Sequence, residues 1–202
     1  MLKIEKTEVV GFEHAIRGMR NPKNSWDRSD SLCGYVGVAD EKLMTQLRDA
    51  GSDHRKFMRM LGVYADITAP LYWWKEYDTY KVGTVANSCS TMHKIHSKDF
   101  TLSDFSHEHL TTSSLEVLEN TITHLNQMRR SYVEAVKPNK SDWWQMIQLL
   151  PSSYNQKRTV SLSYEVLANM YHARNGHKLD EWHTMREWME KLPQAYLITG
   201  GK

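Results

Sequence analysis

The segment from 113 to 136 carries the strongest pattern in the chain. Its apolar residues recur at intervals of three and four, and they are Leu115, Leu118, Ile122, Leu125 and Met128. This spacing places them on one face of an α-helix. Ser113 and Glu116 form the Ser-x-x-Glu pattern of an N-terminal capping box, and Pro138 follows the last periodic residues. We therefore predict a long amphipathic helix, from 113 to about 136, that buries this face in a core.

Shorter segments carry helix signals of their own, and they are 41–50, 70–80, 141–150, 163–174 and 179–192. Asp40 is a preferred N-cap residue for the first of them, and Gly51 is suited to end it. Pro70 is favoured as a first helical residue, and Ser163 as an N-cap. The chain is therefore predicted to be rich in helix.

Strand signals are fewer and weaker. Residues 1–10 alternate loosely and suit an edge strand, residues 56–67 are rich in strand formers, and residues 159–162 suit a short strand. Residues 83–90 are small and polar, which predicts a loop that lets backbone approach a ligand. We predict an α+β fold with a small mixed or antiparallel sheet, formed by one domain that spans 1–202.

Charge and hydropathy exclude several classes of protein. The net charge is only +2, so binding of nucleic acid polymers or anionic membranes through bulk charge is not expected. The mean hydropathy is −0.62, and no apolar run is long enough for a membrane span or a signal peptide. Cys33 and Cys89 are too few for a disulfide framework. We expect a soluble, cytoplasmic protein.

Histidines and cysteines offer weak alternatives for chemistry. His93 and His96 are three residues apart, and His107 and His109 are two apart, which are tolerable spacings for metal ligands. No carboxylate or thiol is arranged with them, so no metal site is predicted. Cys89 and His93 could act as nucleophile and base, but no third group that would orient the base is apparent.

Two tryptophan pairs, Trp73-Trp74 and Trp143-Trp144, could stack on a nucleobase or a flavin ring. Adjacent residues on a helix point about 100° apart, so at most one member of each pair could face a given ligand. Packing in the core or between subunits is the favoured interpretation of both pairs.

Cationic side chains are the more suggestive feature. They occur in three separate stretches: Arg17, Arg20 and Lys23, then Lys81, then Arg174 and Lys178. Such groups can converge on a phosphate, which guanidinium binds in a bidentate way. The alternative is that they are solvated surface charges, and their spacing does not decide between the two.

Several motifs follow one another in a distinctive order. They are Gly51-Ser-Asp-His-Arg-Lys-Phe57, Ala69-Pro70, Thr79-Tyr-Lys-Val-Gly-Thr84, Leu150-Pro151 and Glu181-Trp182. This order resembles the flavin-dependent thymidylate synthase family over residues 40–95 and 145–185. The resemblance implies the fold of that family, and a homotetramer that binds its ligands between subunits.

The signature motif of that family holds flavin and the phosphate of deoxyuridine monophosphate, and it falls on residues 79–92. Lys81 keeps a positive charge of the signature and Thr84 keeps a hydroxyl. At other signature positions, which carry Arg, His, Glu and Arg in the family, this chain has Thr79, Tyr80, Asn87 and Thr91.

The C-terminal part matches the family at further positions. The resemblance implies that Arg174 binds the nucleotide, that Asn169 contacts flavin, and that Lys178 stands for a basic family residue. Four other positions near the flavin carry residue types that differ from those of the family, and they are Arg55, Met58, Ser163 and Glu165.

Three functions remain open at this point. The first is a divergent enzyme that uses FAD to methylate a deoxyuridine monophosphate-like nucleotide. The second is an inactive protein, of phage origin, that sequesters a nucleotide or a nucleotide-derived signal against host defence. The third is an assembly scaffold that binds no small ligand. For the first two, the predicted phosphate-binding residues are Lys81, Thr84, Arg174, Arg17 and Arg20, and the predicted cofactor-binding residues are Asn169, Tyr80 and Lys178.

Overall fold

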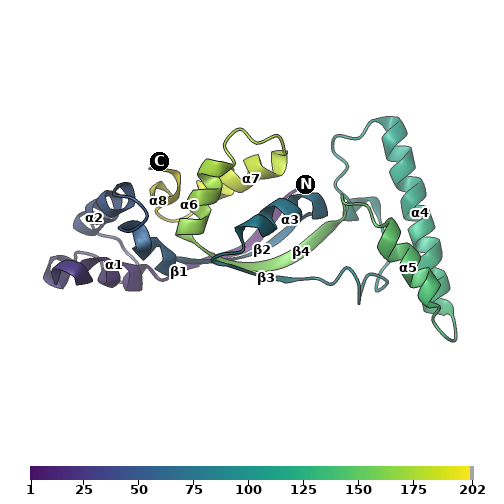
Figure 1. Cartoon of the computed structure of the whole chain (residues 1–202), viewed down its shortest axis with the longest axis horizontal. Coiled ribbons are helices and arrows are strands. Elements are labelled where there is room, and N and C mark those ends of the chain that lie inside the picture. Colours follow the sequence, from purple (N-terminus) through teal and green to yellow (C-terminus); the bar gives the residue numbers. More distant parts are fainter. Residues whose placement is uncertain (201–202) are drawn as a thin grey trace. The chain divides into compact units, whose positions relative to one another are not determined.

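The computed structural model describes residues 1–200, and it contains one four-stranded antiparallel sheet. The strands are β1 (Lys3–Val10), β2 (Gly62–Pro70), β3 (Thr84–Ser88) and β4 (Asn155–Ser163). Their order in the sheet is β1-β2-β4-β3, so β1 is an edge strand, as predicted. Figure 1 labels these strands and the helices that accompany them.

Eight α-helices are present among the described residues. They are α1 (Phe12–Arg20), α2 (Val38–Asp49), α3 (Leu71–Tyr77), α4 (Thr112–Glu134), α5 (Lys140–Leu149), α6 (Tyr164–Ala173), α7 (Asp180–Met189) and α8 (Tyr196–Thr199). The predicted helix-rich α+β fold with a small sheet is therefore confirmed. Within residues 1–200, none of these helices combines the length and the apolar character needed to cross a membrane.

The chain divides into two compact units. Unit 1 consists of residues 1–3, 67–79 and 87–158, and unit 2 consists of residues 4–66, 80–86 and 159–202. Unit 1 therefore contains α3, α4 and α5, and unit 2 contains the other five helices. Each of the four strands contributes residues to both units.

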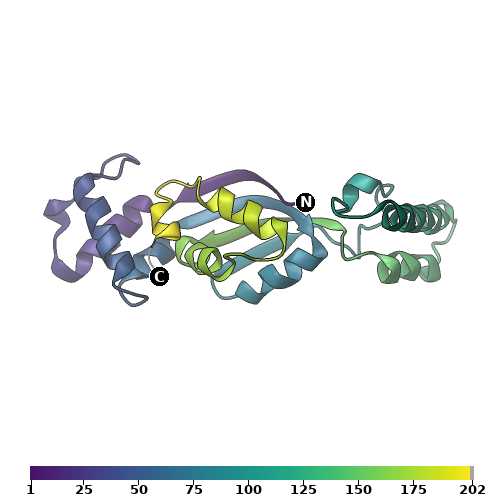
Figure 2. The same ribbon diagram turned by 90° about the horizontal axis from the view of Figure 1, so that it is seen from above.

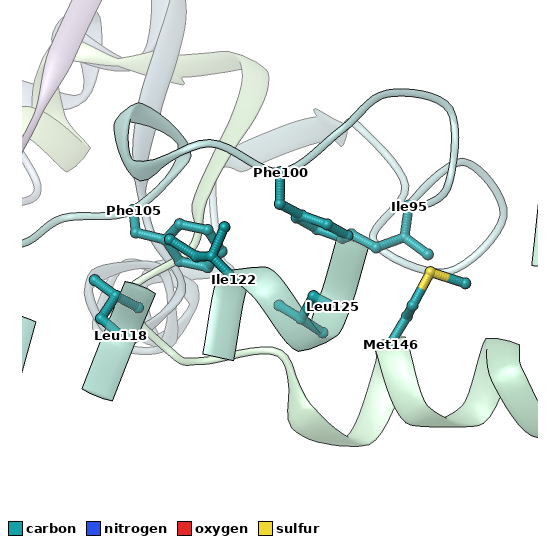
Figure 3. Close-up of a cluster of buried hydrophobic side chains, with 7 residues drawn as sticks. All are labelled: Ile95, Phe100, Phe105, Leu118, Ile122, Leu125 and Met146. Atoms are coloured by element: carbon teal, nitrogen blue, oxygen red, sulfur yellow. The ribbon is translucent and has the colours of Figure 1, made fainter. Parts of the chain in front are cut away.

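Unit 1 has an apolar core of its own, built on the helix that the sequence predicts most clearly. Leu118, Ile122 and Leu125 are buried on one face of α4, beside Phe105 from the preceding segment and Met146 from α5. Figure 3 shows these side chains, and Figure 1 shows α4 and α5 side by side. Because burying a large apolar side chain contributes about 1.5–3 kcal/mol, this face of α4 stabilises unit 1.

Unit 2 contains α1 and α2, which lie beside each other (Figure 2). The 3₁₀-helix Arg55–Met60 packs against α1, α2 and α6. Its Phe57 and Met58 are buried. The Tyr164 amide donates to the Leu61 carbonyl (3.0 Å), and this bond ties the start of α6 to the end of the 3₁₀-helix.

Two predictions of local structure are wrong in the N-terminal half. The predicted strand over 56–67 begins only at Gly62, because residues 55–60 form the 3₁₀-helix in which the neighbours Phe57 and Met58 are both buried. Asp40 is not an N-cap, since α2 begins at Val38. Gly51 does follow the end of α2, with φ of 100°.

Two further corrections concern residues 83–116. The predicted loop over 83–90 contains β3, whose side chains are almost all exposed. A strand of this kind lacks the alternation of apolar residues by which strands are recognised. The N-cap of α4 is Thr111, which accepts a hydrogen bond from the Ser114 amide (3.4 Å), and the predicted capping box at Ser113 is therefore wrong.

Candidate functional site

Arg174 lies directly after the last residue of α6, within unit 2. Its Nε donates a hydrogen bond to the Tyr80 hydroxyl (3.0 Å). The centre of its guanidinium lies 5.3 Å from the centroid of the Tyr80 ring and 4.7 Å from that of the Trp182 ring. A guanidinium at these distances is attracted to the faces of aromatic rings. The two rings therefore hold the half-buried Arg174 side chain in a defined position.

The segment 80–86 lies close against α6. Gly83 has φ of 82°, and a Cβ added to it would lie 3.0 Å from the Val166 side chain. This position therefore suits glycine both in its conformation and in the space that is available. The Thr84 hydroxyl donates to the Tyr80 carbonyl (2.8 Å) and so fixes the backbone beside the Tyr80 ring. The structure thus brings the predicted residues Tyr80, Thr84 and Arg174 together.

Two exposed lysines flank this group along the chain. Lys81 follows Tyr80, and Lys178 lies in the segment between Arg174 and Trp182. Neither lysine forms an ion pair within residues 1–200. Arg174, Lys81 and Lys178 are thus three cationic residues that belong to neighbouring segments of unit 2. We call Tyr80, Lys81, Thr84, Arg174 and Trp182 the Arg174 cluster.

Asn169, the predicted flavin-contacting residue, belongs to a different polar group on α6. Its amide oxygen accepts a hydrogen bond from Arg55 Nη2 (3.0 Å). Glu165, one turn earlier, forms ion pairs with Arg55 (3.6 Å between Nε and Oε1) and with Arg59. The hydrogen bond from Arg59 to Glu165 raises the pKa of the Arg59 guanidinium above its ordinary value. At these positions the chain therefore has a network of two arginines around one carboxylate.

Arg20 is also placed away from the Arg174 cluster, in a buried ion pair. Its Nε donates to Asp40 Oδ1 (2.6 Å), and the other oxygen of Asp40 accepts from the hydroxyls of Ser29 and Ser31 (2.7 Å each). Burial raises the pKa of the Asp40 carboxyl, but the hydrogen bonds from Ser29, Ser31 and Arg20 outweigh burial, and the pKa lies below its ordinary value. Asp40 is therefore ionised at neutral pH.

Arg17 is exposed on α1, and its guanidinium is 3.1 Å from His14 Nδ1. Neither Arg17 nor Arg20 forms a hydrogen bond or ion pair with a residue of the Arg174 cluster. The structure therefore separates the predicted phosphate-binding residues into two groups, one around Arg174 and one on α1.

The Trp73-Trp74 pair is buried in unit 1, which confirms that these residues pack in a core. Trp74 Nε1 donates to the Gln156 carbonyl (3.0 Å), and Trp143 Nε1 donates to the Met92 carbonyl (3.0 Å). The side chains of His, Cys, Asp and Glu do not gather in groups of three or more that could hold a metal ion, as far as residues 1–200 are concerned.

The roles of two residues, Trp182 and Glu165, were not predicted. The contact of Trp182 with Arg174 was not predicted. The one local signal for it is the Asn175-Gly176 pair, which is typical of a turn and lies between α6 and α7. Glu165 was noted only as a replacement near the flavin. Its pairing with Arg55 and Arg59 joins segments more than one hundred positions apart, which no local pattern reveals.

The architecture is that of the flavin-dependent thymidylate synthases. Two crystal structures of thymidylate synthase X (ThyX) from Helicobacter pylori, both with FAD and dUMP, match this chain with TM-scores of 0.71 and 0.70, at 15% and 16% sequence identity. Each match covers 98% of this chain and 97% of the other. These similarities confirm the predicted ThyX-like fold.

A related match is the crystal structure of a UMP/dUMP methylase, PolB, from Streptomyces cacaoi, bound with 5-Br dUMP. Its TM-score is 0.62 at 13% identity, and the match covers 94% of this chain and 88% of PolB. No protein-family model matches the sequence, and no curated protein matches it. At identities this low, the similarity concerns the fold alone.

Proposed function

We propose that this protein binds a pyrimidine nucleoside monophosphate at the Arg174 cluster. In this proposal the phosphate binds to the guanidinium of Arg174 and the ammonium group of Lys81. Arginine binds phosphate through two parallel N–H donors, and lysine binds it through the compact charge of its ammonium group. Lys178 adds positive charge at the rim, and Thr84 acts as a positioning residue because it holds the backbone of Tyr80.

The observation that carries this proposal is the placement of Arg174 against the rings of Tyr80 and Trp182. A guanidinium that is already held in place loses less conformational freedom when an anion binds, and this improves affinity. The dUMP in the ThyX crystal structures and the 5-Br dUMP in PolB support a pyrimidine nucleotide as the ligand class. The predicted homotetramer, with a pocket completed between subunits, is part of the proposal.

FAD fits this chain poorly. The amide oxygen of Asn169 already accepts a hydrogen bond from Arg55. Glu165 is only 9% exposed, and its carboxylate forms ion pairs with Arg55 and Arg59. A flavin that displaced the two arginines would leave the buried Glu165 carboxylate without its partners, at a cost of about 1–3 kcal/mol. We therefore propose nucleotide binding without flavin chemistry, which is a sequestering role.

Calorimetric titration of the purified protein with dUMP tests the proposal. We expect saturable binding, and we expect deoxyuridine, which lacks the phosphate, to bind far more weakly. Arg174→Ala removes charge-assisted hydrogen bonds worth about 1.5–3 kcal/mol each, so the dissociation constant for dUMP should rise at least tenfold.

Arg186→Ala is a matched control for this titration. Arg186 on α7 lies over the ring of Tyr171, at 4.2 Å from the centroid, and it is also an arginine on an aromatic face. The control should bind dUMP like the unaltered protein. If Arg174→Ala binds dUMP as tightly as the control does, the Arg174 cluster is not the site.

Flavin-dependent methylation is the second candidate, favoured by the joint presence of FAD and dUMP in the ThyX crystal structures. It predicts that the purified protein retains visible flavin absorbance after incubation with FAD and removal of the excess. We expect no retained flavin. Retained flavin that disappears in Glu165→Ala or Asn169→Ala would favour the enzyme over the sequestering protein. Native mass spectrometry of the same sample reports the number of subunits.

A further inference from the structure

Unit 2 contains two neighbouring cavities beside α1, each of about 440 Å³. The first, which we call the aromatic cavity, is lined by residues that include Phe12, Ile16, Arg17, Arg20, Trp26 and Tyr35. The second, which we call the cationic cavity, is lined by Arg20, Lys23, Ser25, Arg28, Ala39 and Leu43. Arg20 lines both cavities, so its side chain stands between them.

The lining of the cationic cavity includes three cationic side chains and no acidic one, and the charge of Arg20 is paired with Asp40 behind the wall. Lys23 and Arg28 are exposed, and neither has an acidic partner within residues 1–200. Arg20 is only 4% exposed. Its Nε donates to Asp40 and its Nη1 to the Ser25 carbonyl, whereas its Nη2 forms no hydrogen bond with the described residues. The buried guanidinium thus retains a donor for a bound anion.

The aromatic cavity has walls that are held in place although they are exposed. Trp26 is 51% exposed, yet its Nε1 donates to the Asn21 side chain (2.8 Å). Tyr35 is 67% exposed, and its backbone is paired with Leu32 by two hydrogen bonds of 3.0 Å that close a tight turn. Exposed aromatic rings on a fixed backbone are suited to stacking on a planar ligand at little cost in entropy.

One short element joins the two cavities. The 3₁₀-helix Trp26–Arg28 contributes Trp26 to the aromatic cavity and Arg28 to the cationic cavity. It is followed by Ser29, whose hydroxyl donates to Asp40, the same carboxylate that holds Arg20. The buried Asp40 therefore fixes the relative positions of the walls of the aromatic cavity and the cationic cavity.

We propose that the two cavities together bind one nucleoside polyphosphate. The base stacks on Trp26 in the aromatic cavity, and the phosphates bind Arg20 Nη2, Lys23 and Arg28 in the cationic cavity. Glu13 and Arg17 also line the aromatic cavity. The carboxylate of Glu13 repels phosphate from the aromatic cavity and can accept a hydrogen bond from an N–H of the base. Arg17 can donate a hydrogen bond to a carbonyl of the base. This site uses no residue of the Arg174 cluster and stands independently of the function proposed above.

Titration calorimetry with GTP, dUTP and inorganic triphosphate tests this proposal. We expect both nucleotides to bind at least tenfold more tightly than inorganic triphosphate, because base stacking on an aromatic side chain contributes to affinity. Arg28→Ala should weaken the binding of all three probes at least tenfold. Trp26→Ala should weaken the two nucleotides about tenfold and leave inorganic triphosphate unchanged.

The exposed residue Lys42 on α2 lines neither cavity, so Lys42→Ala is the matched control for the loss of one positive charge. Thermal unfolding should show that Trp26→Ala and Arg28→Ala remain folded, since both side chains are exposed. The proposal is overturned if Arg28→Ala binds the probes like Lys42→Ala. It is also overturned if inorganic triphosphate binds as tightly as the nucleotides.

Arg174→Ala separates this site from the one proposed above. We expect it to lose dUMP binding and to keep the affinity for GTP and dUTP. Two sites are supported if Arg174→Ala loses only dUMP binding and Arg28→Ala loses only the binding of GTP, dUTP and inorganic triphosphate. If Arg174→Ala loses all of these ligands while remaining folded, there is one site and the second is refuted.

Discussion

Trp73 and Trp74 on α3 differ from Trp26 and Tyr35 beside α1, although all four are large aromatic residues. The first two are buried in unit 1, at 0% and 1% exposure, and their rings pack edge to face at 4.9 Å. The other two are exposed beside a cavity whose lining includes two arginines. The buried pair stabilises the fold, whereas the exposed pair is available for a ligand.

The role of an aromatic residue depends on its surroundings in the fold and cannot be assigned from the sequence alone. Trp74 also lies against a cation, because the guanidinium of Arg158 is 4.1 Å from its ring centroid. That guanidinium is paired with Asp78 (2.8 Å) and with the side chain of Gln156, so it stabilises the structure locally. Lys23 and Arg28, beside Trp26, have no such partner in the described part of the chain.

The largest effect is expected for Trp74→Ala. Removing a fully buried tryptophan leaves a cavity and removes its hydrogen bond to the Gln156 carbonyl, so unfolding in urea should show a loss of about 3–5 kcal/mol. Trp144→Ala, at an exposed position, is the control and should lose far less stability. Equal losses in the two variants would contradict the assignment of Trp74 to the core.

A somewhat smaller effect is expected for Asp40→Asn. This substitution leaves the buried Arg20 without its countercharge, which costs about 3 kcal/mol for a buried pair. Asp99→Asn, at an exposed pair with Arg129, should cost less than about 1 kcal/mol. A loss in Asp40→Asn no greater than in Asp99→Asn would show that Asp40 does not organise the walls of the two cavities.

The stability of the protein should depend on pH through Asp40. The pKa of Asp40 is lowered in the folded protein, so its contribution to stability is fully present above the ordinary value of 3.8 and is lost as the pH falls through the folded value. Urea unfolding between about pH 5 and pH 2 should therefore show a steeper loss in the unaltered protein than in Asp40→Asn. Parallel curves would contradict the lowered pKa.

The smallest effect on stability is expected for Trp26→Ala. Substitutions at exposed positions usually change the free energy of unfolding by less than about 0.5 kcal/mol, so urea unfolding should hardly differ from that of the unaltered protein. A loss of several kcal/mol would mean that Trp26 belongs to the core of unit 2, and the contrast with Trp74 would then fail.

The fold was largely predictable because its main signals are local. The apolar face of α4, the edge strand β1 and the Ser163 cap of α6 each follow from spacing or from single residues. The prediction of a strand over residues 55–60 was wrong because this segment forms a 3₁₀-helix. The 3₁₀-helix packs against α1 and α6. That packing joins distant segments and leaves no periodic pattern in the sequence.

The candidate site was predictable only in part. Arg174, Tyr80 and Thr84 were named from the resemblance, and the structure brings them together. That they bind a nucleotide stays a prediction. The contacts of Trp182 with Arg174 and of Glu165 with Arg55 could not be predicted, because each depends on how separate segments fold back on one another. The cavities beside α1 likewise depend on the shape of a non-helical segment, residues 21–37.

A crystal structure of the protein with dUMP would show where the phosphate binds. We predict that phosphate oxygens lie about 2.7–3.2 Å from the guanidinium nitrogens of Arg174, with the Lys81 ammonium group also in contact. A nucleotide whose phosphate is bound elsewhere in the molecule, with no contact to Arg174, would contradict binding at the Arg174 cluster.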